Sequence, residues 1–140
     1  MVDDEYDVVY IVKRILEEIG SFQVDAYTDP SVALYYFEPE TYDLAILDIR
    51  MPDINGFELY KKIKAVDQKV KTCFLSAVHD LRDYKLTHPA LVDAIERDDE
   101  CFIDKPIGSE KLINRINKIL SNKARNIQYN TSINKQLIPE

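Results

Sequence analysis

Short apolar runs alternate along this chain with segments whose apolar residues recur at helical spacing. The clearest run covers residues 44–47 (Leu-Ala-Ile-Leu), which are all apolar, and it stops abruptly at Asp48. A strand without a polar face is buried on both sides, as in the middle of a parallel sheet. The alternation of such strands with helices predicts βαβ units, and therefore an α/β fold.

Similar runs at residues 72–75 and 101–103 predict two further strands, and a weaker run predicts a short strand near residues 23–27. The last of the buried runs is followed by Asp104 and Lys105. Helices are predicted between the strands from apolar spacing, Asp or Ser caps and Pro at first helical positions. They cover residues 8–19, 30–37, 57–65, a segment opening at Pro89, and a last helix capped by Ser109.

Length and charge limit what the chain can do. Its 140 residues suit one compact domain, and its formal charge of −7 weighs against direct nucleic-acid binding. No apolar stretch approaches the roughly 18–20 residues that span a bilayer, and the acidic start is unlike a secretory signal. We therefore expect a cytoplasmic protein without a membrane partner, in which Cys73 and Cys101 are buried free thiols.

The residues that follow the predicted strands are chemically distinctive. Asp3 and Asp4 follow a short first strand at residues 1–2, Asp48 follows the run at 44–47, Ser76 the run at 72–75 and Lys105 the run at 101–103. In open α/β sheets, ligands bind beyond the carboxyl ends of the strands, so these side chains should meet there. Clustered carboxylates repel one another unless a hard cation such as Mg²⁺ offsets their charge. One carboxylate can then act as a nucleophile toward phosphorus, with an ammonium nearby.

Four motifs share this order: Val-Asp-Asp-Glu at residues 2–5, Leu-Asp-Ile-Arg-Met-Pro-Asp-Ile-Asn-Gly at 47–56, Leu-Ser-Ala at 75–77 and Phe-Ile-Asp-Lys-Pro at 102–106. In these motifs the chain resembles the receiver domains of two-component response regulators, built like the chemotaxis-type single-domain members. The resemblance implies a flavodoxin-like, doubly wound, five-stranded parallel sheet in the order 2-1-3-4-5. It places a receiver domain at residues 1–120 and a polar extension or tail at residues 121–140.

The resemblance also implies roles for the site residues. Asp48 would accept the phosphoryl group, and Mg²⁺ would bind Asp4 directly, Asp3 mainly through water, Asp48, and the backbone carbonyl of Arg50. No other cofactor is implied. The side chain of Arg50 either faces solvent or reaches the phosphoryl group.

Lys105 and Ser76 would hold the phosphoryl group, and Phe102 would turn inward as Ser76 moves toward it. The peptide between Lys105 and Pro106 would be cis, and the small Ala77 would leave the acceptor accessible.

The sequence departs from this family in two places. Only Met1 and Val2 precede the acidic pair, so the first strand is truncated, or the native start lies upstream. The segment from Ser76 to Lys105 is longer than usual, with the surplus near residues 79–88, which is either a tolerated loop insertion or a private docking surface.

The implied function is signalling rather than metabolic catalysis, with the chain assisting its own phosphorylation and dephosphorylation. A histidine kinase or phosphotransfer protein would donate the phosphoryl group, a downstream protein would respond, and a homodimer stays open. Three alternatives remain. The first is a degenerate scaffold, and the second is a receiver cut from a regulator with a DNA-binding output. The third is an Mg²⁺-dependent aspartyl phosphatase, although such enzymes need an Asp where Arg50 stands.

Overall fold

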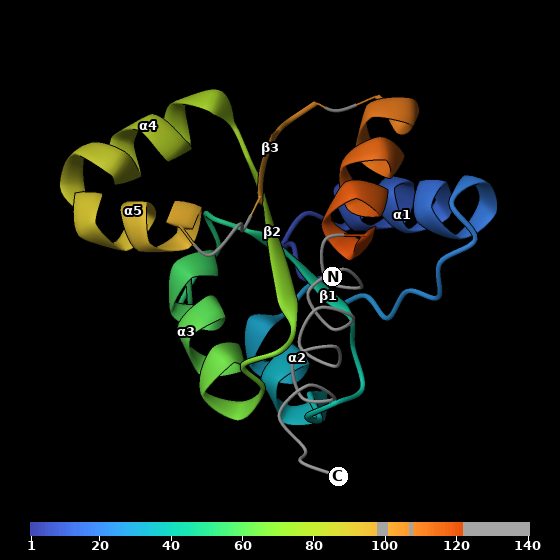
Figure 1. The fold of residues 1–140 in the computed structure, drawn as a ribbon, viewed down its shortest axis with the longest axis horizontal. Coiled ribbons are helices and arrows are strands. Elements are labelled where there is room, and N and C mark those ends of the chain that lie inside the picture. The colour runs from blue at the N-terminus through green and yellow to red at the C-terminus, as the bar shows by residue number, and fades with distance from the viewer. Residues whose placement is uncertain (98–100, 107, 122–140) are drawn as a thin grey trace, which may run out of the picture.

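The structure is a computed structural model that describes residues 1–97, 101–106 and 108–121. A parallel sheet lies in the middle of the molecule, and helices cover both of its faces (Figure 1). Within the described residues, no helix is both long and apolar enough to cross a membrane. The predicted tail at residues 121–140 lies outside the described residues, except for Ser121.

Three strands form the regular part of the sheet, in the order β1-β2-β3. They are β1 (Leu44–Asp48), β2 (Lys71–Ser76) and β3 (Cys101–Asp104), and all of them run parallel. In the pairing register, Asp48 lies opposite Leu75 on β2, while Ser76 lies opposite Asp104 on β3. The carboxyl ends of the three strands therefore meet at one edge of the sheet.

Beyond β1, two bridge residues, Val2 and Tyr27, extend this sheet. Val2 forms parallel bridges to Leu47 on one side and to Tyr27 on the other. Its backbone N–H donates to the Ile46 carbonyl, and its own carbonyl accepts from the Asp48 N–H. The strand order 2-1-3-4-5 is thus confirmed, with the single bridge residues Val2 and Tyr27 in the places of the first two strands.

One face of the sheet is covered by α1 (Tyr6–Arg14), the π-helical turn η1 (Ile15–Ile19) and a helix at residues 109–121. In Figure 1 these helices lie together on one side of the strands. Apolar side chains from the helices and from alternate strand positions form their core. The buried members are Val12, Leu16, Ile46, Cys73, Leu75, Ile103, Leu112, Ile116 and Ile119.

The opposite face is covered by α2 (Pro30–Tyr36), α3 (Gly56–Val66), α4 (Val78–Thr87) and α5 (Pro89–Arg97). Figure 1 shows α4 and α5 side by side beyond the upper end of α3. The buried residues on this face come from the remaining strand positions and from three of the helices. They include Ala33, Ala45, Leu47, Phe57, Leu59, Ile63, Phe74, Val92 and Ile95.

Three expectations need correction. The surplus at residues 79–88 is a helix, α4, rather than a loop, because Leu81 and Tyr84 recur on one face and pack against the core. The last helix begins at Ser109 itself, so its N-cap residue is Gly108 rather than Ser109. Cys73 is buried as expected but is disulfide-bonded rather than free, and its register partner on β3 is Cys101.

Candidate functional site at the carboxyl edge of the sheet

Asp48 and Ser76 reach the site because each is the last residue of a strand. Asp48 is the last residue of β1 and is 5% exposed, while Ser76 is the last residue of β2 and is fully buried. The Lys105 N–H donates to the Ser76 carbonyl (2.8 Å), which fixes the chain that leaves β3 beside the end of β2. The sheet therefore brings together the residues that sequence order kept far apart.

The amino-terminal segment adds two carboxylates. The backbone N–H of Asp3 donates to the Tyr27 carbonyl, and Asp3 is fully buried, whereas Asp4 is exposed. Carboxylate oxygens of Asp3, Asp4 and Asp48 lie within 4.8 Å of one another. This all-oxygen donor set, with one exposed member and two buried ones, fits a hard divalent cation such as Mg²⁺.

The ammonium of Lys105 faces two of these carboxylates. Its Nζ atom donates to Asp3 Oδ2 at 2.7 Å and to Asp48 Oδ1 at 3.2 Å. Burial alone would lower the pKa of Lys105. Hydrogen bonding and attraction from Asp3, and then from Asp48, outweigh burial and raise this pKa. The peptide between Lys105 and Pro106 is cis, as expected.

The protonation of Asp48 responds strongly to this environment. Burial, and to a smaller extent repulsion from Asp3, raises the pKa of Asp48 from 3.8 to about 7. Attraction and hydrogen bonding from Lys105 act in the opposite direction and lower this pKa, but by less. A carboxylate with a pKa this high gains most from an added cation, because the cation favours the charged form. The position thus suits a nucleophile that is activated by a bound metal ion.

Gly56 allows the close approach that shapes this edge. A Cβ atom on Gly56 would lie 2.2 Å from the carbonyl oxygen of Asp48, and the Gly56 N–H donates to the Ile49 carbonyl. The first turn of α3 therefore packs directly on the end of β1. The sequence contains a signal for this residue, the Asn55-Gly56 turn, but the contact with Asp48 required the structure.

Across β2 and β3, Ser76 lies opposite Asp104 and Phe102 lies opposite Phe74, so Ser76 and Phe102 are two register positions apart. The Ser76 hydroxyl is buried and has no hydrogen-bond partner among the described residues. A buried hydroxyl without a partner is unfavourable, so a ligand oxygen that could accept from it would be stabilised. Phe102 is half-buried, with its ring stacked on that of Phe74 at a centroid distance of 5.3 Å.

A cleft of ≈ 440 Å³ opens above these residues. Its lining includes Asp4, Asp48 and Lys105, together with Ala77, which leaves room beside Asp48. The remaining lining residues are Glu5, Arg50, Met51, Pro52 and Asp80.

Two charged residues of this lining were not predicted. Sequence reasoning missed Glu5 and Asp80, and it left the side chain of Arg50 undecided. Arg50 is largely exposed, and its guanidinium contacts Asp80 across the cleft.

Comparisons with known proteins agree with this geometry. A family model described as the response regulator receiver domain matches residues 1–117. The response regulator SaeR of Staphylococcus epidermidis is 31% identical over 147 residues, covering 98% of this chain and 59% of that protein. The transcriptional regulatory protein SpaR of Bacillus subtilis is 34% identical, covering 89% of this chain and 52% of that protein. The chain thus spans about half the length of the curated relatives that it matches.

Solved structures share the fold. The non-phosphorylated HemR receiver domain of Leptospira biflexa superposes with a TM-score of 0.65 at 27% identity, covering 86% of this chain and 90% of that one. A CheY-like response regulator receiver domain protein from Methanospirillum hungatei gives a TM-score of 0.70 at 24% identity, covering 89% and 94%. The second likeness supports the fold alone.

Proposed function

This chain belongs to the response regulator receiver domain family of two-component signalling, and we propose that within it Asp48 accepts a phosphoryl group in an Mg²⁺-dependent reaction. The observation that carries the proposal is the position of the Lys105 ammonium. It lies within hydrogen-bond distance of both Asp3 and Asp48, at an edge where three carboxylates face one another. Such an arrangement can receive a phosphoryl group as well as a cation.

Mg²⁺ would be held by Asp3, Asp4, Asp48 and the backbone carbonyl of Arg50. The carboxylate oxygens of the three aspartates lie close enough to share one ion, and a single ammonium leaves their negative charge in excess. When bound, the ion would offset that charge and help to neutralise the oxygens of the transferring phosphoryl group.

The transfer would proceed from a phosphohistidine on a histidine kinase or phosphotransfer protein. An oxygen of the Asp48 carboxylate attacks phosphorus, forming an O–P bond while the N–P bond of the donor breaks. The leaving imidazole takes up a proton from solvent, and Asp48 becomes an acyl phosphate. Lys105 donates to a phosphoryl oxygen, which keeps its ammonium paired after the charge of Asp48 has been consumed.

Ser76 and Phe102 would couple this event to the protein surface. The Ser76 hydroxyl is buried without a partner among the described residues, so a phosphoryl oxygen would give it an acceptor. A small shift of Ser76 toward the phosphate would leave space on the β2 side, and the half-buried Phe102 would move into it. The affected surface would comprise β3 and the helices that flank it.

We propose that residues 1–120 form the receiver domain. Its output would be a changed affinity for a protein target, including a second copy of the chain. The chain spans about half the length of SpaR, a transcriptional regulatory protein, so a DNA-binding output joined to such a domain is the alternative arrangement.

The test is labelling by acetyl phosphate, with the products resolved on phosphate-affinity gels. Wild type should be labelled in Mg²⁺ and unlabelled in EDTA, Asp48→Asn should not be labelled, and Asp4→Asn should need far more Mg²⁺. Asp83→Asn, an exposed carboxylate on α4, is the matched control and should behave like wild type. No labelling of wild type would support a scaffold, while sustained turnover of an exogenous phosphate ester would support a phosphatase.

A further inference from the structure

The cleft above Asp48 is bridged by an ion pair. Arg50, two residues beyond Asp48, places Nη2 2.8 Å from Oδ1 of Asp80 on α4. The two side chains are unequally exposed, at 67% for Arg50 and 15% for Asp80. Because both residues line the cleft that contains Asp48 and Lys105, the pair is part of the wall of the site.

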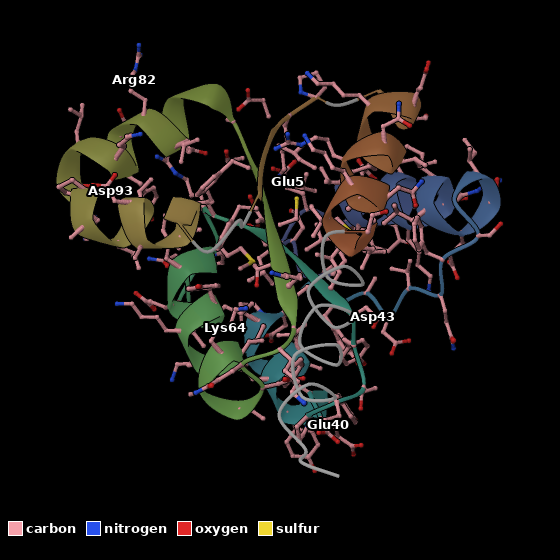
Figure 2. All side chains as sticks on the ribbon, in the orientation of Figure 1. Glu5, Glu40, Asp43, Lys64, Arg82 and Asp93 are labelled. Carbon is pink, nitrogen blue, oxygen red and sulfur yellow. The ribbon has the colours of Figure 1, made fainter. Side chains whose placement is uncertain are left out.

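The inserted helix is what brings Asp80 to this position. Helix α4 begins at Val78, only two residues after Ser76, and the Asp80 N–H donates to the Ala77 carbonyl at 3.0 Å. Two other charged side chains on α4 are directed elsewhere. Asp83 is exposed, and Arg82 points away from the molecule (Figure 2).

Helix α4 also packs on the core through apolar side chains. Among its described side chains, Leu81 and Tyr84 contact the core and are only partly buried, whereas Leu86 is 77% exposed. The ring of Tyr84 lies against that of Phe57, at a centroid distance of 4.9 Å. An ion pair at the first turn can therefore influence how firmly the start of α4 is held.

We propose that the Arg50–Asp80 pair is a latch that holds the first turn of α4 against the cleft, and that a phosphoryl group on Asp48 releases it by competing for Arg50. The proposal rests on phosphorylation of Asp48. A phosphoryl group brings about 1.5–2 negative charges and three acceptor oxygens, and an arginine fork matches such an anion better than it matches one carboxylate. Asp80, left beside a new anion of its own sign, is then repelled from the cleft.

Competition of this kind has a reciprocal consequence. If phosphoryl binding loosens α4, then loosening α4 by another route must favour phosphoryl binding to the same degree. Asp80 is thus a positioning residue: it acts on the site through Arg50, and its removal should aid occupation of the site rather than impair it.

The test combines amide hydrogen exchange over α4 with calorimetric titration of beryllofluoride, a phosphoryl mimic, in excess Mg²⁺. In wild type, the mimic should raise exchange in the first turns of α4 about two- to fivefold, the factor that an exposed ion pair is ordinarily worth. Asp80→Asn should show this faster exchange without the mimic, show no further rise with it, and bind the mimic about two- to fivefold more tightly.

Two further variants make the result specific. Asp83→Asn removes the same charge from the same helix and should match wild type in both measurements. Arg50→Ala should loosen α4 as much as Asp80→Asn does, and the double variant should loosen it no further, because the two residues act as one pair.

The outcomes separate the latch from the phosphoacceptor proposal. If wild type binds the mimic but exchange in α4 stays constant or falls, or if Asp80→Asn matches Asp83→Asn, the latch is overturned and the acceptor role of Asp48 stands. If wild type binds no mimic in Mg²⁺, the acceptor role itself fails. Faster exchange in mimic-free Asp80→Asn would then show only that the ion pair holds the helix, and release by phosphate would be excluded.

Discussion

The ammonium of Lys105 lies 2.7 Å from a carboxylate oxygen of Asp3, a residue 102 positions earlier in the chain. Asp3 is fully buried, and its other carboxylate oxygen accepts from the Glu5 N–H. The contact joins the segment after β3 to the start of the chain and keeps a buried charge compensated. The same ammonium contacts Asp48, so one side chain serves both the stability of the fold and the chemistry of the site.

Replacing Lys105 should therefore weaken the protein as well as its reactivity. Lys105→Met leaves two mostly buried carboxylates without their cation, and breaking such a pair costs about 3 kcal/mol. We expect the free energy of unfolding in urea, measured at pH 8 without divalent cations, to fall by roughly this amount. Lys61→Met, at an exposed position on α3, is the control and should change it by less than about 0.5 kcal/mol. An unchanged value for Lys105→Met would contradict the importance of this contact.

Much of the site could be predicted from sequence because strand ends carry it. A buried parallel strand is recognisable from its continuous apolar run, and the residue that follows it must lie at the carboxyl edge. This logic placed Asp48, Ser76 and Lys105 correctly. It needed no knowledge of side-chain directions, since the pairing of β1, β2 and β3 aligns their ends.

The part that sequence reasoning missed depends on where a helix begins. Residues 79–88 have few apolar positions, and Leu86 is exposed, so helical periodicity is weak there and the segment resembles a loop. The onset of α4 at Val78 turns Asp80 toward Arg50, and an onset one residue later would rotate it by about 100°. The contact of Gly56 with Asp48 was also missed, because it depends on how closely α3 approaches β1.

The raised pKa of Asp48 should make stability depend on pH in an unusual direction. In the folded, metal-free protein this carboxyl holds its proton up to about pH 7, whereas in the unfolded chain it loses it near 3.8. The stability that the retained proton contributes is fully present below about pH 3.8 and is lost progressively as pH rises from there to about 7. Asp48→Asn removes this loss, so its advantage in unfolding free energy over wild type should grow by roughly 2–3 kcal/mol between pH 5 and 8.

Urea unfolding in EDTA at the two pH values measures this difference directly. Asp83→Asn controls for the loss of one exposed carboxylate and should show no such growth. Saturating Mg²⁺ should stabilise wild type at pH 8 and not Asp48→Asn, because only wild type offers the third carboxylate. If the difference in unfolding free energy between Asp48→Asn and wild type stayed constant from pH 5 to pH 8, the pKa of Asp48 would not be raised in the folded protein.

Ser76→Ala should separate stability from ligand binding. The Ser76 hydroxyl is buried and has no partner among the described residues, so its removal should leave the unfolding free energy unchanged or raise it by about 1 kcal/mol. The same change removes a donor to a phosphoryl oxygen, so beryllofluoride should bind about tenfold more weakly. Calorimetry and urea unfolding on one preparation give both numbers. Equal loss of stability and of binding would instead point to a structural role for the hydroxyl.

Gly56→Ala tests whether close packing of α3 holds Asp48 in place. The added Cβ would meet the Asp48 carbonyl oxygen at 2.2 Å, so the start of α3 or the end of β1 must move. Overpacking of this kind costs about 1–3 kcal/mol, and the displacement of Asp48 should slow labelling by acetyl phosphate at saturating Mg²⁺. Gly108→Ala is the control for adding a methyl group without a steric clash, because a Cβ there meets no atom within 4 Å. If both alanine variants were labelled at the wild-type rate, the position of Asp48 would not depend on this contact, and the strand end alone would suffice to hold it.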